Sequence, residues 1–225
     1  MDGEGGQGVT KPDPKTPRER YRAEVRAEIK ERAWEQIAGA GASALSLNAI
    51  AKQIGMSGPA LYRYYAGRDE LITELVKDAY RSLADTLRAA SAAGADLAGL
   101  AHALREWALQ DPQRYFLIYG TPVPGYHAPE ETTGITGEMM ATLLDAFMAL
   151  PGDSPATPFD AHLEDHRDWA DDHPAHPAVL HRALIFWTRL HGILSLELAG
   201  HFTGMGFDPA QLFAAELDAL LAYWA

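Results

Sequence analysis

The chain of 225 residues contains no cysteine. Disulfide bonds, thiolate-bound metal ions and cysteine-based redox sensing are therefore excluded. The absence of cysteine also agrees with a reducing compartment, in which structural disulfides are rare. We expect a cytoplasmic protein.

Long apolar segments are missing as well. No apolar run approaches the roughly 18 residues that a membrane-spanning helix needs, and the start of the chain, MDGEGGQG, has neither the basic nor the apolar region of a secretion signal. We therefore expect no membrane contact. The chain has no internal repeat and no alternating strand pattern of useful length. Its 47% hydrophobic and 22% charged residues are typical of a globular protein with a sizeable core.

The net charge of −12 argues against nucleic-acid binding by the chain as a whole, because an acidic surface repels phosphates. This charge is unevenly distributed. Residues 18–77 contain ten Lys and Arg against eight Asp and Glu, whereas residues 78–225 contain seven against twenty. The N-terminal third is thus the part of the chain that a phosphate backbone would not repel.

Helical patterns fill most of the chain. TPRE at 16–19 has the form of a capping box, with Thr16 as N-cap and Pro17 at the first helical position. The helix that follows has an apolar stripe with one member every four residues: Val25, Ile29, Ala33 and Ile37. Further helices are expected at 66–90, 96–110, 113–119, 129–150, 177–201 and 208–224. We predict an all-α fold.

Two short helices are expected between the first helix and the long one. SLNAIAKQIG (46–55) offers Ser46 as N-cap and Gly55 as the stop, and SGPALYRYY (57–65) offers Ser57 as N-cap. Two short helices separated by a tight turn form a helix-turn-helix.

Over residues 41–76, GASALSLNAIAKQIGMSGPALYRYYAGRDELITELV, the sequence resembles the DNA-binding segment of the tetracycline-repressor (TetR) family. The shared features are a scanning helix with Ala-Ile-Ala, a Gly-Met-Ser turn and a recognition helix ending in Leu-Tyr-Arg-Tyr-Tyr. DPQRYFLIYGTPVPGY (111–126) and WTRLHG (187–192) resemble the subset of this family whose ligand domain carries a Trp…His-Gly signature.

The resemblance implies a homodimeric, ligand-responsive transcriptional regulator without catalytic residues or cofactors. Its partners would be double-stranded DNA and a small-molecule effector. We expect a repressor, with an activator as the alternative. Residues 1–15 are predicted to be a disordered tail, residues 16–67 a three-helix DNA-binding domain with the helix-turn-helix, and residues 68–225 a larger helical domain for ligand binding and dimerisation.

The predicted DNA contacts lie on the two short helices and just after them. Small residues at the start of the recognition helix would let its backbone approach base edges in the major groove. Tyrosine hydroxyls would reach phosphates, and the resemblance assigns that role to Tyr62, Tyr64 and Arg68. Arg63 would either read a guanine or be solvated. The full set is Ser46, Lys52, Ser57, Gly58, Pro59, Ala60, Tyr62, Arg63, Tyr64 and Arg68.

Aromatic residues and one histidine of the C-terminal part are candidates for a ligand pocket. The alternative is that they only fill the core, because aromatic residues at helical spacing are most often core residues. His191, one turn after Trp187, could offer a hydrogen bond to a bound molecule. The candidates are Trp107, Tyr115, Phe116, Tyr119, Phe147, Trp187 and His191. We expect a largely apolar ligand.

The helix at 177–201 is predicted to be buried on two faces, one of which would pack against a second copy of the chain. Gly192, Ser195 and Ala199 form a strip of small residues along which another helix could approach closely. The helix at 208–224 is the natural second contributor. Together they predict a homodimer with a four-helix interface, which the resemblance also implies.

Residues 162–177, HLEDHRDWADDHPAHP, suggest a function of another class. His162 and His166 have the i, i+4 spacing that lets two imidazoles share a metal ion on a helix. The alternative function is therefore a metal-dependent hydrolase. Against it, Pro174 and Pro177 interrupt helical structure, so we favour a solvated acidic loop near 151–176.

Overall fold

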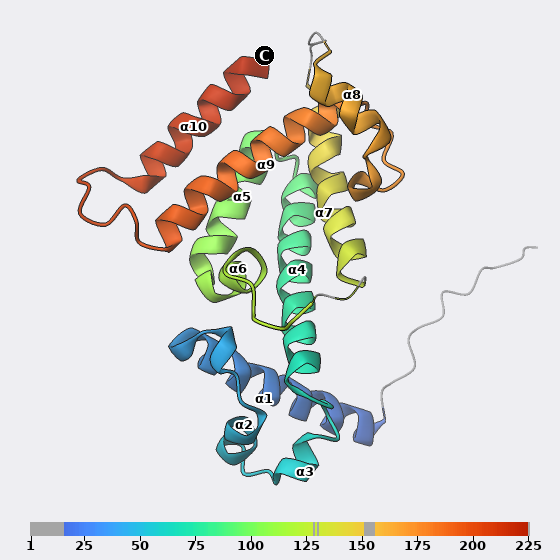
Figure 1. Ribbon diagram of the computed structural model, residues 1–225, viewed down its shortest axis with the longest axis vertical. Coiled ribbons are helices and arrows are strands. Elements are labelled where there is room, and N and C mark those ends of the chain that lie inside the picture. The colour runs from blue at the N-terminus through green and yellow to red at the C-terminus, as the bar shows by residue number, and fades with distance from the viewer. Residues whose placement is uncertain (1–15, 128, 130, 151–155, 225) are drawn as a thin grey trace, which may run out of the picture. The chain divides into compact units, whose positions relative to one another are not determined.

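The computed structural model describes residues 16–127, 129, 131–150 and 156–224, and the predicted 1–15 tail lies outside them. All regular secondary structure in these ranges is helical, which confirms the all-α prediction (Figure 1). The chain divides into two compact units that meet in sequence at Arg68 and Asp69. None of the described helices is both long and apolar enough to cross a membrane.

The first unit contains α1 (Pro17–Ala40), a short 3₁₀ helix η1 (Ala42–Ala44), α2 (Leu47–Gln53) and α3 (Gly58–Leu61). Thr16 and Glu19 form the predicted capping box at the start of α1. The predicted apolar stripe of α1 is buried, and this helix packs on η1 and α2. Gly41 ends α1 with a φ of +77°, a conformation that favours glycine, and its N–H donates to the Ile37 carbonyl at 2.8 Å.

The second unit is built from the remaining helices: α4 (Arg68–Ala92, beginning at the last residue of the first unit), α5 (Leu97–Gln110), α6 (Pro112–Tyr119), α7 (Glu131–Met148), α8 (Pro158–Asp165), η2 (Asp168–Ala170), α9 (Pro177–Leu198) and α10 (Pro209–Trp224). α9 contacts α5, α7, α8 and α10, so it is the central helix of this unit (Figure 1). One continuous apolar core contains residues from Leu83 to Trp224.

The prediction of an acidic loop near 151–176 is wrong for residues 158–165, which form α8 and pack on α9. Thr157 and Asp160 form a capping box with Pro158 at the first helical position, the same arrangement as at residues 16–19. Leu163 is buried beneath the helix. Pro177 is the first residue of α9, as predicted for the helix at 177–201, and a proline needs no N–H partner at this position. Residues 151–155 lie outside the described ranges.

Candidate nucleic-acid interface and aromatic cluster

The two short helices join through a tight turn. Ser46 caps α2, because its hydroxyl accepts a hydrogen bond from the Ala49 N–H at 3.4 Å. Gly55 follows α2 with a φ of +68°, and the Met56 N–H then donates to the Ala51 carbonyl at 2.8 Å. Ser57 occupies the N-cap position of α3 but makes no side-chain cap hydrogen bond. The chain therefore reverses at a backbone conformation that favours glycine.

The recognition helix is shorter than the predicted 57–65. Only Gly58–Leu61 is α-helical, and the following residues form tighter turns, with the Tyr64 N–H donating to the Leu61 carbonyl at 2.8 Å. Leu61 and Tyr65 are fully buried, as expected for core residues. Tyr62, between them, is 49% exposed, and Arg63 is also exposed. The buried side chains of Leu61 and Tyr65, the two anchors, thus fix the backbone on either side of the exposed Tyr62 and Arg63, which we call the Tyr-Arg pair.

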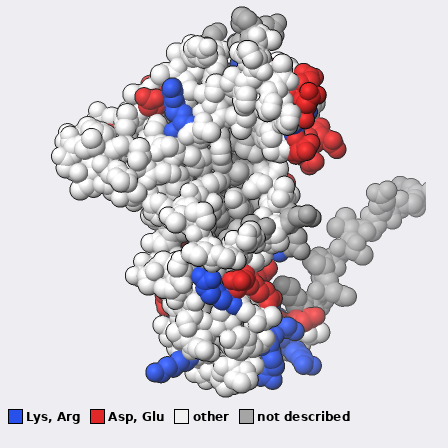
Figure 2. All heavy atoms as spheres, in the orientation of Figure 1, with Lys and Arg blue, Asp and Glu red and all other residues white. Residues whose placement is uncertain are grey.

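Nine of the ten predicted DNA contacts lie on α2, on α3 or in the residues that flank them, and the tenth, Arg68, is the first residue of α4. Those that are exposed are Ser46, Lys52, Ser57, Pro59, Tyr62 and Arg63, and those that are half-buried are Gly58, Ala60, Tyr64 and Arg68. Figure 2 shows Lys and Arg side chains on the surface of the first unit, on the face drawn.

Arg68 makes contacts that the sequence did not predict. Its guanidinium donates to the backbone carbonyls of Ala42 at 3.0 Å and Ser43 at 3.4 Å. These hydrogen bonds fasten the start of α4 to the segment that precedes α2. Arg68 therefore has a structural task within the first unit, beside the phosphate contact predicted for it.

The second unit contains a cluster of aromatic rings around His191. The ring centroid of His191 lies 4.0 Å from that of Trp187 and 4.2 Å from that of Tyr119. The Tyr115 hydroxyl lies 3.0 Å from His191 Nδ1, 3.1 Å from the His191 carbonyl oxygen and 2.8 Å from Ser195 Oγ. We call Tyr115, Tyr119, Trp187 and His191 the aromatic cluster.

His191 is held neutral in the aromatic cluster, because burial lowers its pKa to about 3. Its Nε2 atom is buried and has no hydrogen-bond partner among the described residues. Such an atom is uncommon in folded proteins, where buried polar groups are nearly always paired. Within the described residues, one hydrogen-bonding capacity of His191 is therefore unused.

The seven predicted ligand residues do not all meet. Four form the aromatic cluster, and Phe116 packs its ring on Tyr115 at 5.8 Å. Phe147 instead packs on Phe186 and Trp224, at 5.4 and 5.3 Å. The indole N–H of Trp107 donates to Ser82 Oγ on α4 at 3.1 Å.

Sequence reasoning missed two residues of α4 beside the cluster. The ring of Tyr80 lies 6.1 Å from that of Tyr119. Ser82 accepts hydrogen bonds from Trp107 and, at 3.2 Å, from Arg114 of α6. No short-range pattern could have identified them, because their partners are 25 or more residues away in sequence.

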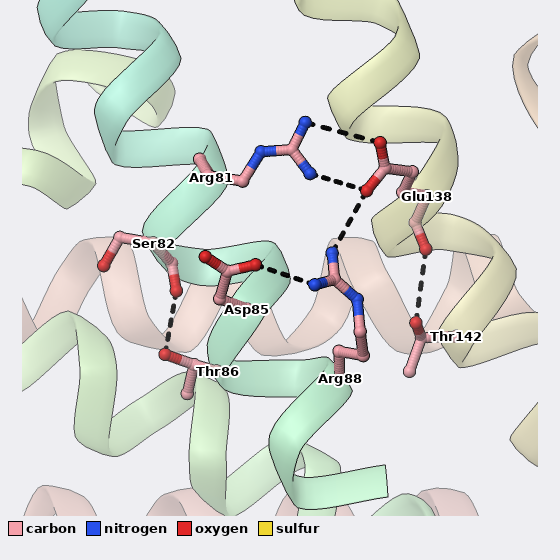
Figure 3. A network of polar contacts seen from close by, with 7 residues as sticks. All are labelled: Arg81, Ser82, Asp85, Thr86, Arg88, Glu138 and Thr142. Carbon is pink, nitrogen blue, oxygen red and sulfur yellow. Dashed lines mark hydrogen bonds and ion pairs between the residues drawn. The ribbon is translucent and has the colours of Figure 1, made fainter. Parts of the chain in front are cut away.

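A polar network joins α4 to α7 in this unit (Figure 3). Glu138 accepts hydrogen bonds from Arg81 at 2.6 Å and from Arg88 at 3.1 Å, and Arg88 also pairs with Asp85 at 2.9 Å. These side chains are 43 to 55% exposed, so each pair contributes little to stability. An open groove beside the network is lined by Asp78, Arg81, Ser82, Asp85, Thr86, Ala89 and Arg114.

Within the part of the chain that the structure describes, the histidines of residues 162–177 form no metal site. The rings of His162 and His166 stack face to face at 4.0 Å, and His166 Nδ1 lies 2.9 Å from the His162 carbonyl oxygen. His173 pairs with Asp145 at 3.1 Å. Among the described residues, no group of three or more potential ligands has an arrangement that could hold a metal ion.

The helix-turn-helix unit, followed by a larger helical unit, is the architecture of a DNA-binding transcriptional regulator. Two family models match the chain. "Bacterial regulatory proteins, tetR family" matches residues 29–75, and "Tetracyclin repressor-like, C-terminal domain" matches residues 97–220. The chain belongs to the TetR family of bacterial transcriptional regulators.

Relatives in other bacteria agree with this assignment. The chain is 36% identical to the HTH-type transcriptional regulators Rv1816 of Mycobacterium tuberculosis and Mb1846 of Mycobacterium bovis, over 91% of this chain and 94% of each relative. It is also 71% identical to the regulatory protein SCO4313. The crystal structure of that protein matches this chain with a TM-score of 0.86, over 92% of this chain and 100% of its own. A protein from Rhodococcus sp. RHA1 shares the fold. Its structure matches with a TM-score of 0.65 and 21% identity, over 89% of this chain and 95% of its own. The named relatives are regulators, and the hydrolase alternative receives no support.

Proposed function

We propose that the protein is a homodimeric TetR-family repressor that binds a pseudo-palindromic operator and is released by a small, largely apolar molecule. It belongs, in this proposal, to the subset with the Trp…His-Gly signature. Residues 16–67 bind DNA, and residues 68–225 bind the ligand and dimerise. The observation that carries the ligand response is the buried Nε2 of His191 inside the aromatic cluster, which has no partner among the described residues.

DNA binding in this proposal uses the exposed Tyr-Arg pair between the anchors Leu61 and Tyr65. Tyrosine and serine hydroxyls on α2 and α3 contact phosphates and set the position of the unit on the duplex. Ala60 and Arg63 contact base edges, since a guanidinium matches the two acceptors of guanine in the major groove. Because the chain has one such motif, specific binding requires two copies on an inverted repeat.

Arg63→Ala is expected to relax the sequence preference at one position of each half-site and to cost roughly 1–3 kcal/mol of specific affinity. Tyr62→Phe is expected to weaken binding to all sequences, because it removes a phosphate contact. Selection from random duplex DNA, followed by fluorescence anisotropy, measures both effects. Arg32→Ala, on α1, serves as the control and should leave the preference intact. Unchanged preference and affinity in both Arg63→Ala and Tyr62→Phe would contradict the proposed interface.

Dimerisation in this proposal uses α9 and α10. Small residues lie exposed along both helices: Gly192 on α9 and Ala199 directly after it, and Ala215, Ala219 and Ala222 on α10. Larger apolar side chains are also exposed there, with Leu196 at 46% and Tyr223 at 81%. Ser195, from the predicted strip, instead points its hydroxyl at Tyr115, so Gly192 is the cleaner position at which to test the interface.

The hydrogen bonds around Tyr115 define what the ligand must supply. The tyrosine has a single hydroxyl proton, whereas the His191 carbonyl can only accept. If the hydroxyl proton is donated to the His191 carbonyl, His191 carries its own proton on Nδ1 and donates it to the tyrosine oxygen, so that Nε2 carries a lone pair. In the other tautomer Nε2 carries the proton. In both cases an uncharged polar group on an otherwise apolar ligand completes the site.

Ligand binding can change DNA affinity through α4. On α4, the ring of Tyr80 contacts that of Tyr119, and Ser82 accepts hydrogen bonds from Trp107 and Arg114. The same helix begins at Arg68, the last residue of the DNA-binding unit. A ligand that moves the rings around His191 therefore acts on α4, the helix that follows the recognition segment, residues 58–65. A small rotation of α4 would misplace the recognition segments of both subunits on an operator whose half-site spacing is fixed.

Trp187→Phe and His191→Gln are expected to reduce the response to an inducing compound at least tenfold while changing ligand-free operator affinity less than about twofold. Their matched controls are Trp169→Phe and His102→Gln. The compound is identified by screening for loss of operator binding. It should bind the operator complex more weakly by the factor with which it weakens DNA binding. An unchanged response in both variants would place the pocket elsewhere.

A further inference from the structure

The recognition segment is too short to maintain its own conformation. α3 has four residues, whereas isolated helices below about 12 residues are marginal in water. Its conformation therefore depends on contacts from the rest of the unit. Leu61 and Tyr65 provide two such contacts through their buried side chains.

Arg26 of α1 provides a third contact, and it is polar. Its Nη1 donates a hydrogen bond to the Tyr64 carbonyl oxygen at 3.0 Å. The centre of the same guanidinium lies 4.4 Å from the ring centroid of Tyr65. A planar guanidinium can make both contacts at once, because its edge donates while its face stacks on the aromatic ring. A lysine ammonium is a compact point charge without that face.

We propose that Arg26 is a positioning residue for DNA recognition: it fixes the end of the recognition segment, so that Tyr62 and Arg63 are presented in a single orientation. This proposal rests on the proposed DNA interface. Tyr64 is adjacent to Arg63, and its N–H donates to the Leu61 carbonyl in the backbone turn that holds this side chain, while its carbonyl accepts from Arg26. Without Arg26 the buried Tyr65 remains, but the Tyr64 carbonyl loses its guanidinium donor.

A positioning residue and a phosphate-binding residue have different signatures in salt. Each lysine or arginine that neutralises a phosphate contributes about one unit to the slope of log K against log salt concentration. Arg26 is half-buried and its guanidinium faces Tyr65, so its loss should leave this slope unchanged. Specific affinity should fall, because the base-contacting side chain is no longer held in place.

The test compares Arg26→Lys and Arg26→Met with wild type as full-length chains. The probes are a duplex enriched from random DNA by the wild-type protein and the same duplex with its sequence scrambled. We expect both variants to bind the enriched duplex roughly 10- to 100-fold more weakly, about the cost of one mismatched base pair. Binding to the scrambled duplex and the salt slope should match wild type. Hydrogen exchange should be faster at the amides of residues 58–65.

The control is Arg32→Lys, the same substitution on the same helix at a residue that pairs with Glu35 near the surface. It should behave as wild type. A salt slope reduced by about one in Arg26→Met, or wild-type specific affinity in both Arg26 variants, overturns the proposal. If Arg26→Lys does not fold, Arg26→Met decides, and loss of folding in both assigns Arg26 to stability instead. A wild-type chain that enriches no duplex at all contradicts the DNA interface itself.

Discussion

Gly192→Arg is expected to convert the proposed dimer into monomers and to reduce specific operator affinity about 10³-fold or more, to the level of non-specific binding. Gly192 is exposed on α9, and beyond the backbone of its own helix no atom lies within 4 Å of the place where a Cβ would stand. The arginine therefore has room in a single chain. It has none where α9 packs closely on a second copy, because helices at packing distance exclude a long charged side chain.

Gly134→Arg on α7 is the matched control. Gly134 is also an exposed helical glycine, and a Cβ at this position would likewise meet nothing within 4 Å outside its own helical backbone. The substitution therefore changes charge and helix propensity in the same way. Sedimentation and operator binding should show a dimer for this variant and monomers for Gly192→Arg. An intact dimer in the latter would place the interface on another surface.

Glu197→Ala is expected to destabilise the protein by about 3–5 kcal/mol, the usual cost of leaving one partner of a buried ion pair alone. Glu197 of α9 accepts a hydrogen bond from Arg105 of α5 at 2.6 Å, and their side chains are only 12% and 17% exposed. The Arg105 guanidinium also lies 5.6 Å from the ring centroid of Phe213 on α10. The pair thus ties three helices of the core together.

Urea unfolding at a fixed protein concentration measures this loss, because a dimer's stability depends on concentration. The double variant Arg105→Met/Glu197→Leu should recover most of the stability, since apolar side chains of similar size avoid the uncompensated charge. Asp85→Ala, which breaks an ion pair with 55% exposed side chains, should cost less than about 1 kcal/mol. A Glu197→Ala loss no larger than that of Asp85→Ala would show that water reaches the pair.

The sequence by itself determined the features that depend on neighbouring residues. The capping box at Thr16 and the helix stop at Gly55 follow from short-range hydrogen bonding and backbone sterics, and the buried stripe of α1 follows from its helical periodicity. The helix-turn-helix was predicted on the same basis, and the family models confirm it. α8 was predictable too, because its capping box repeats that of α1, but the density of acidic residues obscured it.

Only the tertiary structure decided which distant groups meet. Arg26 reaches Tyr64 across 38 positions, Tyr115 reaches His191 across 76, and Arg105 reaches Glu197 across 92. It also divided the predicted ligand residues, placing Trp187 beside His191 and Phe147 against Trp224. Helical periodicity states which face of a helix is buried but not which helix covers it, since many packings bury the same apolar stripe equally well. That Nε2 of His191 has no partner among the described residues is therefore visible only once α6 and α9 have been brought together.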